Sequence, residues 1–149
     1  MSYQSKIIEQ VNQLLEEDFE AEVVFQMAAE NLSNKRLKQY FKYSAEQRKQ
    51  FCEDLRSEII RLGGMLQTPT HDFALHGNWR NFSKAVSTND EELILKECIR
   101  AEERIRDRYK EVLSNKLPLT TKYVMENHLT NIKNRVIDVS ALASEMELR

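Results

Sequence analysis

The segment from residue 14 to residue 32 constrains this chain most, because it is a long helical pattern whose buried face contains two acids. Steps of alternating three and four residues follow one face of a helix through Ile8, Val11, Leu15, Asp18, Glu22, Phe25, Ala29 and Leu32. Six of these residues are apolar and would face a partner helix, whereas the two in the middle are carboxylates. Helices rarely bury carboxylates unless another group pairs with them or they bind a metal. The sequence therefore predicts a polar layer inside a helical bundle.

Composition narrows the class of protein that can hold such a layer. The chain has 149 residues, which suits one domain, residues 1–149, with one core. Only three glycines and two prolines interrupt it, as expected for long helices joined by short turns. Charged residues make up 31% of the chain but the net charge is only -2. We therefore expect neither a nucleic-acid partner nor an acidic-membrane partner.

The sequence also lacks the signals of a membrane or exported protein. No apolar run approaches the roughly 20 residues that span a bilayer, and the N-terminal stretch has no apolar signal-peptide core. The protein is therefore expected in the cytoplasm. Cys52 and Cys98 are isolated thiols without metal-ligand spacing. We interpret them as buried, reduced cysteines rather than as a disulfide or redox pair.

Helical periodicity predicts four long helices, at residues 5–32, 35–62, 90–114 and 118–145. A cap at position 33 or 34 leaves only a short turn, which makes the first two helices antiparallel neighbours. The Gly63-Gly64 pair would end the second helix, since glycine accepts the left-handed conformation that closes a helix. Thr88 and Glu91 have the spacing of a capping box and would start the third.

The segment between the second and third long helices is too long for a turn. It is predicted to contain a short helix, residues 74–86, with Leu75, Trp79, Phe82 and Val86 on one side. At ~1.5 Å per residue the long helices reach about 40 Å, and this segment can run back along that length. Such a crossover sets its two flanking helices parallel. His76 shares the side of Trp79, and we interpret this pair as the anchor of the crossover, with a ligand site as the alternative.

Each long helix has polar residues near the middle of its buried face. They are Asp18 and Glu22 in the first helix, Arg48 in the second, Glu102 in the third and His128 in the fourth. The middles of packed helices lie side by side, so these side chains are expected to meet in one layer. The predicted fold is all-α: a ferritin-like four-helix bundle whose long crossover contains a short fifth helix.

Carboxylates and histidine gathered inside a bundle are also what a di-iron or di-manganese centre needs. The usual pattern takes a Glu from two helices and Glu-x-x-His from the other two. Here Glu46 is followed three residues later by Lys49, and His128 is preceded by Met125. Because a guanidinium cannot ligate a metal but can bind two carboxylates, we favour an ion-pair network around the arginine and no cofactor.

Two alternatives stay open for this layer. The first is a di-metal site, for which the ligands would be Asp18, Glu22, Glu102 and His128, with iron or manganese as the cofactor. The second is that the polar layer has been placed one helical turn from its true position.

Four stretches resemble a known family. They are LEEDFEAEVVFQMAAENL, RKQFCEDLRSEIIRLGG, HGNWRNFSKAV and ECIRAEERIRDRYKEVL. In this order they resemble uncharacterised bacterial ferritin-like four-helix-bundle proteins that carry a domain of unknown function. The resemblance covers about residues 11–142 and implies the bundle, the crossover and an association with stress physiology, but no established activity. Glu22 stands where the family usually has glycine.

Three classes of function are compatible with these observations. We favour a non-enzymatic structural or interaction protein with an ion-paired interior, for which a homo-oligomer is left open. The alternatives are a metal-binding or oxidase-type ferritin relative and a small-ligand or partner-binding module that uses the crossover aromatics. No catalytic residue is predicted, because neither cysteine has an evident activating base and no glycine-rich phosphate loop is present.

Overall fold

The computed structural model describes residues 2–67 and 77–147, which contain helices and no strand. The helices are α1 (Tyr3–Asn31), α2 (Lys35–Arg61), α3 (Gly77–Thr88), α4 (Glu91–Leu113) and α5 (Leu119–Glu147). Their bounds confirm the four predicted long helices to within about two residues at each end. In this part of the chain no helix is both long and apolar enough to cross a membrane.

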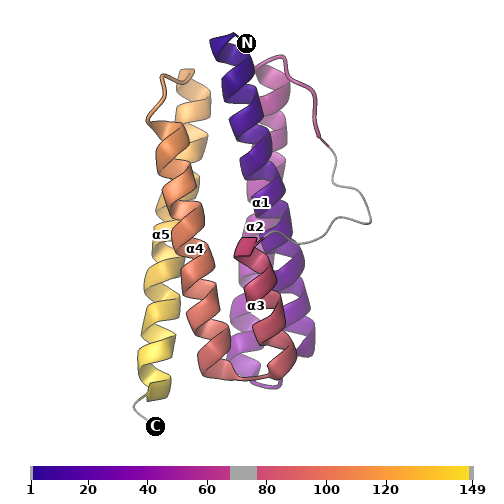
Figure 1. Cartoon of the computed structure of the whole chain (residues 1–149), viewed down its shortest axis with the longest axis vertical. Helices are drawn as coiled ribbons and strands as arrows, with labels where there is room; N and C mark the ends of the chain where they lie inside the picture. Colours follow the sequence, from indigo (N-terminus) through magenta and orange to yellow (C-terminus); the bar gives the residue numbers. More distant parts are fainter. Residues whose placement is uncertain (1, 68–76, 148–149) are drawn as a thin grey trace.

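The long helices form two antiparallel hairpins, α1 with α2 and α4 with α5 (Figure 1). Helix α3 packs against α1 and α4 and runs antiparallel to α4, which runs back up the bundle (Figure 1). Helices α2 and α4 run in the same direction. The all-α bundle with a short fifth helix in its crossover is confirmed.

Side-chain caps fix where the helices begin. The Asn34 side chain accepts hydrogen bonds from the two amides at positions 36 and 37, which starts α2. Asp90 is the N-cap of α4, since its carboxylate accepts a hydrogen bond from the amide of Leu93. The predicted Thr88–Glu91 capping box is wrong: Thr88 is the last residue of α3, and its hydroxyl accepts from the Asp90 amide. Asn89, at φ 58°, makes the sharp turn between them.

The glycine pair ends α2 as predicted. Gly63 has φ +82°, and the amide of Gly64 donates to the carbonyl of Ile59 at 2.8 Å. A Cβ on Gly64 would lie 2.5 Å from a methyl carbon of Ile8, so α1 packs directly on this turn. The turn therefore fixes the end of α2 against α1.

Helix α3 is held by an aromatic cluster formed by Phe25, Phe41, Trp79 and Phe82. Trp79 is fully buried, and its ring centre lies 5.2 Å from that of Phe25 in an edge-to-face contact. Phe82 lies 5.4 Å from Phe41 of α2. The start predicted for this helix, with Leu75 and His76, lies outside the described residues. Within them α3 begins at 77 and ends two residues later than predicted.

Candidate functional site

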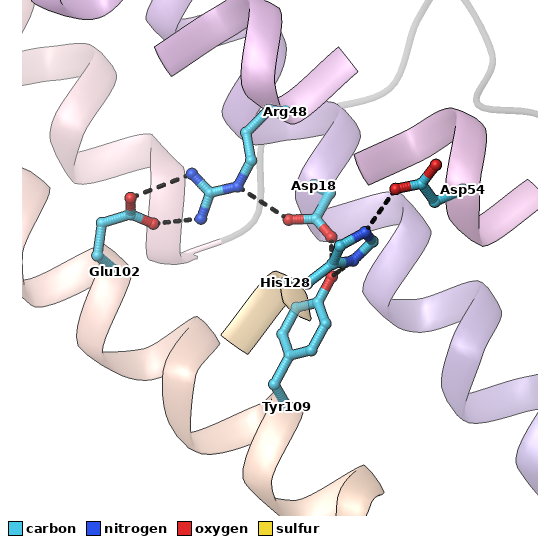
Figure 2. A network of polar contacts seen from close by, with 6 residues as sticks. All are labelled: Asp18, Arg48, Asp54, Glu102, Tyr109 and His128. Atoms are coloured by element: carbon cyan, nitrogen blue, oxygen red, sulfur yellow. Dashed lines mark hydrogen bonds and ion pairs between the residues drawn. The ribbon is translucent and has the colours of Figure 1, made fainter. Parts of the chain in front are cut away.

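Arg48, in the middle of α2, is the centre of the buried polar layer and is only 1% exposed. Its Nε donates to Oδ1 of Asp18 on α1 at 3.1 Å. Both of its terminal nitrogens donate to the Glu102 carboxylate on α4, Nη1 at 3.1 Å to Oε2 and Nη2 to Oε1 (Figure 2). One guanidinium therefore binds two carboxylates and connects three helices.

Aromatic rings surround this arginine. Its Cζ lies 5.5 Å from the ring centre of Phe25, 5.4 Å from that of Phe51 and 5.9 Å from that of Trp79. At such distances the ring faces attract the cation. The rings come from α1, α2 and α3 and leave little polar surface around the guanidinium. Its charge is therefore stabilised chiefly by the two carboxylates.

A second set of contacts leads from Asp18 toward the surface. Oδ2 of Asp18 lies 2.5 Å from the hydroxyl of Tyr109, which lies 3.0 Å from Nδ1 of His128. Nε2 of His128 is 2.9 Å from Oδ2 of Asp54, whose side chain is 31% exposed (Figure 2). The ring of Phe51 stacks on the His128 imidazole at 4.0 Å. The polar layer thus continues from the buried arginine to a partly exposed carboxylate.

Burial shifts the pKa values of the groups in this layer. Desolvation raises the pKa of Asp18 to about 6, although Arg48 and the Tyr109 hydroxyl oppose the rise. Desolvation also lowers the pKa of His128 below 6.5, against the opposing effect of Asp54. For Tyr109, burial and then the Asp18 charge raise the pKa well above its usual value. At neutral pH the imidazole is therefore mainly uncharged and the phenol keeps its proton.

Arg48 remains a cation despite its burial. Desolvation alone would lower the pKa of its guanidinium, but Glu102 and then Asp18 raise that pKa above its ordinary value. Charge-assisted bonds of this kind are the stronger class of hydrogen bond, and the forked contact with Glu102 also fixes geometry.

Of the predicted site residues, the structure brings Asp18, Arg48, Glu102 and His128 together and leaves Glu22 outside. Glu22 is half-buried, and the cations nearest its carboxylate are Lys49 and Arg56 rather than Arg48. Four residues advance a helix by about 400°, so Glu22 is rotated by about 40° from Asp18. That rotation turns it away from the guanidinium of Arg48. Its placement in the layer was therefore wrong.

Tyr109 and Asp54 belong to the layer but were not predicted as members. Tyr109 did carry a signal, because it follows Glu102 by seven residues and so lies on the same buried face of its helix. Asp54 lies between two apolar stripe positions of α2, and no periodicity distinguishes it from an exposed acid. A separate buried pair, the Thr121 hydroxyl donating to Glu58 at 2.9 Å, was also missed.

The two cysteines are free and buried. Desolvation raises the pKa of Cys52, and it raises that of Cys98 well above its ordinary value. Both side chains are therefore thiols rather than thiolates at neutral pH, and a thiol is a poor nucleophile.

The bundle and its crossover give this chain a ferritin-like fold. The structure resembles a solved one, "Crystal structure of ferritin like, diiron-carboxylate proteins from Bacillus anthracis str. Ames", with a TM-score of 0.62. The match has 17% sequence identity and covers 99% of this chain and 97% of that chain, a likeness that shows the fold alone. Residues 6–115 match the family described as "Domain of unknown function (DUF2383)", and the chain belongs to this family. No curated protein matches it.

The side chains of the layer do not fit a di-metal centre. The oxygens of Asp18 and Glu102 that would face a metal accept hydrogen bonds from Arg48, and a cation already lies between them. Both ring nitrogens of His128 contact other side chains. Among residues 2–67 and 77–147, no group of three or more His, Cys, Asp or Glu side chains could hold a metal ion.

Proposed function

We propose that this protein is a non-enzymatic helical-bundle protein in which a buried ion-pair layer takes the position that a di-metal centre has in metal-binding ferritin relatives. The observation that supports this most is the guanidinium of Arg48, which binds Asp18 and Glu102 in the buried middle of the bundle. In di-metal bundles, carboxylates from facing helices converge on metal cations. Here the arginine supplies the positive charge within the chain itself.

An internal cation of this kind favours a structural role. The forked contact of Arg48 with Glu102 and its single bond to Asp18 are satisfied together in only one axial register of α1, α2 and α4, since a shift by one residue separates the donors from their acceptors. Buried polar groups are best known for selecting such registers, whereas desolvation offsets much of their contribution to stability. We infer a structural or interaction protein that acts in the cytoplasm. A part in stress physiology is an expectation from the family resemblance.

Metal analysis tests this proposal directly. Protein would be produced in medium supplemented with iron and manganese and purified without chelator, and the bound metals would be counted per chain by mass spectrometry. We expect no stoichiometric iron or manganese. Two such ions per chain, lost in a folded His128→Ala variant, would overturn the proposal in favour of a metal-binding or oxidase-type protein.

Variants of Arg48 sharpen this test. If a metal competes with the guanidinium for the same carboxylates, Arg48→Met should increase metal uptake, and Glu102→Gln should abolish it. If the arginine is the only cation of the layer, both variants should remain free of metal. Arg36→Met, which breaks an exposed ion pair with Glu145, is the matched control.

A further inference from the structure

The geometry of the polar layer fixes how many hydrogens its contacts need. The contacts in question join Asp18, Tyr109, His128 and Asp54. The three heavy-atom separations are 2.5 Å, 3.0 Å and 2.9 Å, all hydrogen-bond distances. Each contact therefore needs one hydrogen between its two atoms. Because a hydrogen's position must be assigned from donors and acceptors, the number available can be counted from the chemistry of the four groups.

With ordinary ionisation at neutral pH, the four groups have too few hydrogens. Two aspartates as carboxylates contribute none, the Tyr109 phenol contributes one, and a neutral His128 contributes one. If that imidazole hydrogen is on Nδ1, then Nε2 faces the Asp54 carboxylate with no hydrogen between them. If it is on Nε2, then Nδ1 can only accept from Tyr109, which leaves Oδ2 of Asp18 without a donor, while Oδ1 still accepts from Arg48. A third proton supplies all three contacts.

The third proton can be bound at either of two of these four side chains. On Asp18, the carboxyl donates to Tyr109, the phenol donates to Nδ1 of His128, and Nε2 donates to Asp54. On His128, the imidazolium donates to Tyr109 and to Asp54, and the phenol donates to a charged Asp18. Two simultaneous transfers interconvert these forms: the Asp18 O–H bond breaks as a new Tyr109 O–H bond forms, and the old Tyr109 O–H bond breaks as an Nδ1–H bond forms.

We propose that Asp18, Tyr109, His128 and Asp54 form a proton relay, which carries one proton between the solvent at Asp54 and the buried carboxyl beside Arg48. From the imidazolium form, Nε2 gives its proton to the Asp54 carboxylate, which is exposed enough to pass it to water. These transfers need no other reactant, and the proton is the species that the polar layer binds and releases. This goes beyond the proposed structural role.

The titratable and charged groups around the relay come from α1, α2, α4 and α5. Asp18 faces Arg48 from α2, Tyr109 and the Glu102 charge from α4. His128 of α5 faces Asp54 and the Arg48 charge. Trp79 of α3, whose ring lies beside the Arg48 guanidinium, does not titrate, and the buried Cys52 thiol stays neutral because burial raises its pKa.

These surroundings favour one of the two proton positions. The pKa of Asp18 is raised to about 6 and that of His128 is lowered, so the third proton resides mainly on Asp18 beside a neutral imidazole. Because burial raises the pKa of Tyr109 well above its usual value, a free phenolate does not form and the two transfers occur together. Protonation of Asp18 leaves Arg48 paired with one charged carboxylate, Glu102.

A pH jump tests the relay. The protein would be taken rapidly from pH 7.5 to pH 5 while the infrared band of the protonated carboxyl is followed, with Asp18→Asn used to assign the band. We expect the Asp18 band to appear with a midpoint near pH 6. We also expect Tyr109→Phe and Asp54→Asn to slow its appearance by about tenfold or more, because each removes one step of the path. The Tyr109→Phe variant should also shift the midpoint by about one pH unit.

Controls separate a relay from a merely structural effect. Tyr40→Phe removes a tyrosine hydroxyl that donates to the backbone carbonyl of Arg135 and takes no part in the relay. This variant should leave both the rate and the midpoint unchanged. Circular dichroism would establish that each variant is folded, and the wild-type titration needs no variant. An Asp18 that stays ionised down to pH 4.5 would overturn the relay, as would unchanged rates in the Tyr109 and Asp54 variants. Metal analysis of the same sample tests the proposed function separately.

Discussion

Two buried regions meet at Arg48, and they hold the helices by different physical means. On one side lies the aromatic cluster of Phe25, Phe41, Trp79 and Phe82, in which every ring touches at least one other. On the other side lies the polar layer, in which most atoms have a single partner. The burial of apolar ring surface is largely non-directional and tolerates small displacements, whereas the charged contacts fail when one donor or acceptor moves. The cluster therefore contributes stability, and the layer contributes a defined register.

The two regions also depend on each other. Phe25 and Trp79 exclude water from the guanidinium, which strengthens its attraction to the carboxylates and makes an unpaired charge more costly. Removing a ring leaves a cavity that neighbouring groups can partly fill. Removing one member of the ion network leaves a charge that nothing nearby can neutralise except a proton. Substitutions can therefore separate the two kinds of contribution.

The largest effect is expected for Arg48→Met. It leaves Asp18 and Glu102 buried without their cation, and breaking such a network on one side typically costs ~3–5 kcal/mol. Urea denaturation followed by circular dichroism would measure the loss in the free energy of unfolding. The double variant Arg48→Met with Glu102→Leu should be more stable than Arg48→Met, because one unpaired charge has been removed. Equal stability of the two would show that Arg48 contributes by packing alone.

A loss of similar or smaller size is expected for Trp79→Ala. Trp79 of α3 is fully buried against Phe25 of α1, and truncation of such a ring costs ~3–5 kcal/mol through lost contacts and an unfilled cavity. Trp79→Phe should recover much of this, because a smaller ring still fills part of the space. Since the chain has one tryptophan, acrylamide quenching of wild-type fluorescence reports its burial. Strong quenching in the folded protein would contradict this packing.

The aromatic cluster and the helices around it were largely predictable from the sequence. Phe25, Phe41, Trp79 and Phe82 all recur at helical spacing on apolar faces, so periodicity alone assigns them to the interior. Turn chemistry located the helix ends equally well, except for the start of α4. There both Thr88 and Asp90 are residues that can cap a helix, and it is Asp90 that accepts the hydrogen bond from the amide of Leu93.

The polar layer was predictable only in part. Asp18, Arg48 and Glu102 interrupt apolar stripes, which is a signal in itself. Glu22 gave the same signal and lies elsewhere, because an ideal helix rotates away from a strict alternation of threes and fours. Asp54 gave none, since its role depends on the position of His128 on another helix. The partners of a buried charge depend on three-dimensional proximity, which periodicity in one helix does not specify.

A smaller effect concerns pH and isolates Asp18 within the layer. Burial raises the pKa of Asp18 from 3.8 to about 6, so the folded protein binds this proton more tightly than the unfolded chain. Its stabilising contribution is complete below about pH 3.8 and is lost as the pH rises through about 6, with a slope of up to ~1.4 kcal/mol per pH unit.

The pH effect is measured as a difference between two proteins. His128 works in the opposite direction, because its pKa is lowered from 6.5 and its contribution is lost as the pH falls. We therefore expect the stability of wild type minus that of Asp18→Asn to decrease between pH 4 and pH 7 in urea denaturation. A difference that is constant or rises over this range would show that Asp18 remains ionised in the fold.

The smallest effect is expected for the exposed ion pair between Arg36 and Glu145. Nη1 of Arg36 lies 2.6 Å from Oε2 of Glu145, closer than Arg48 lies to Asp18, but the two side chains are 61% and 51% exposed. Water and salt screen such a pair, and its loss typically costs ~0–1 kcal/mol. Glu145→Ala should therefore change the free energy of unfolding far less than Arg48→Met does, and 1 M salt should remove most of the difference. A loss as large as that of Arg48→Met would mean that short charge contacts stabilise this bundle wherever they lie, and the distinction between its buried layer and its surface would fail.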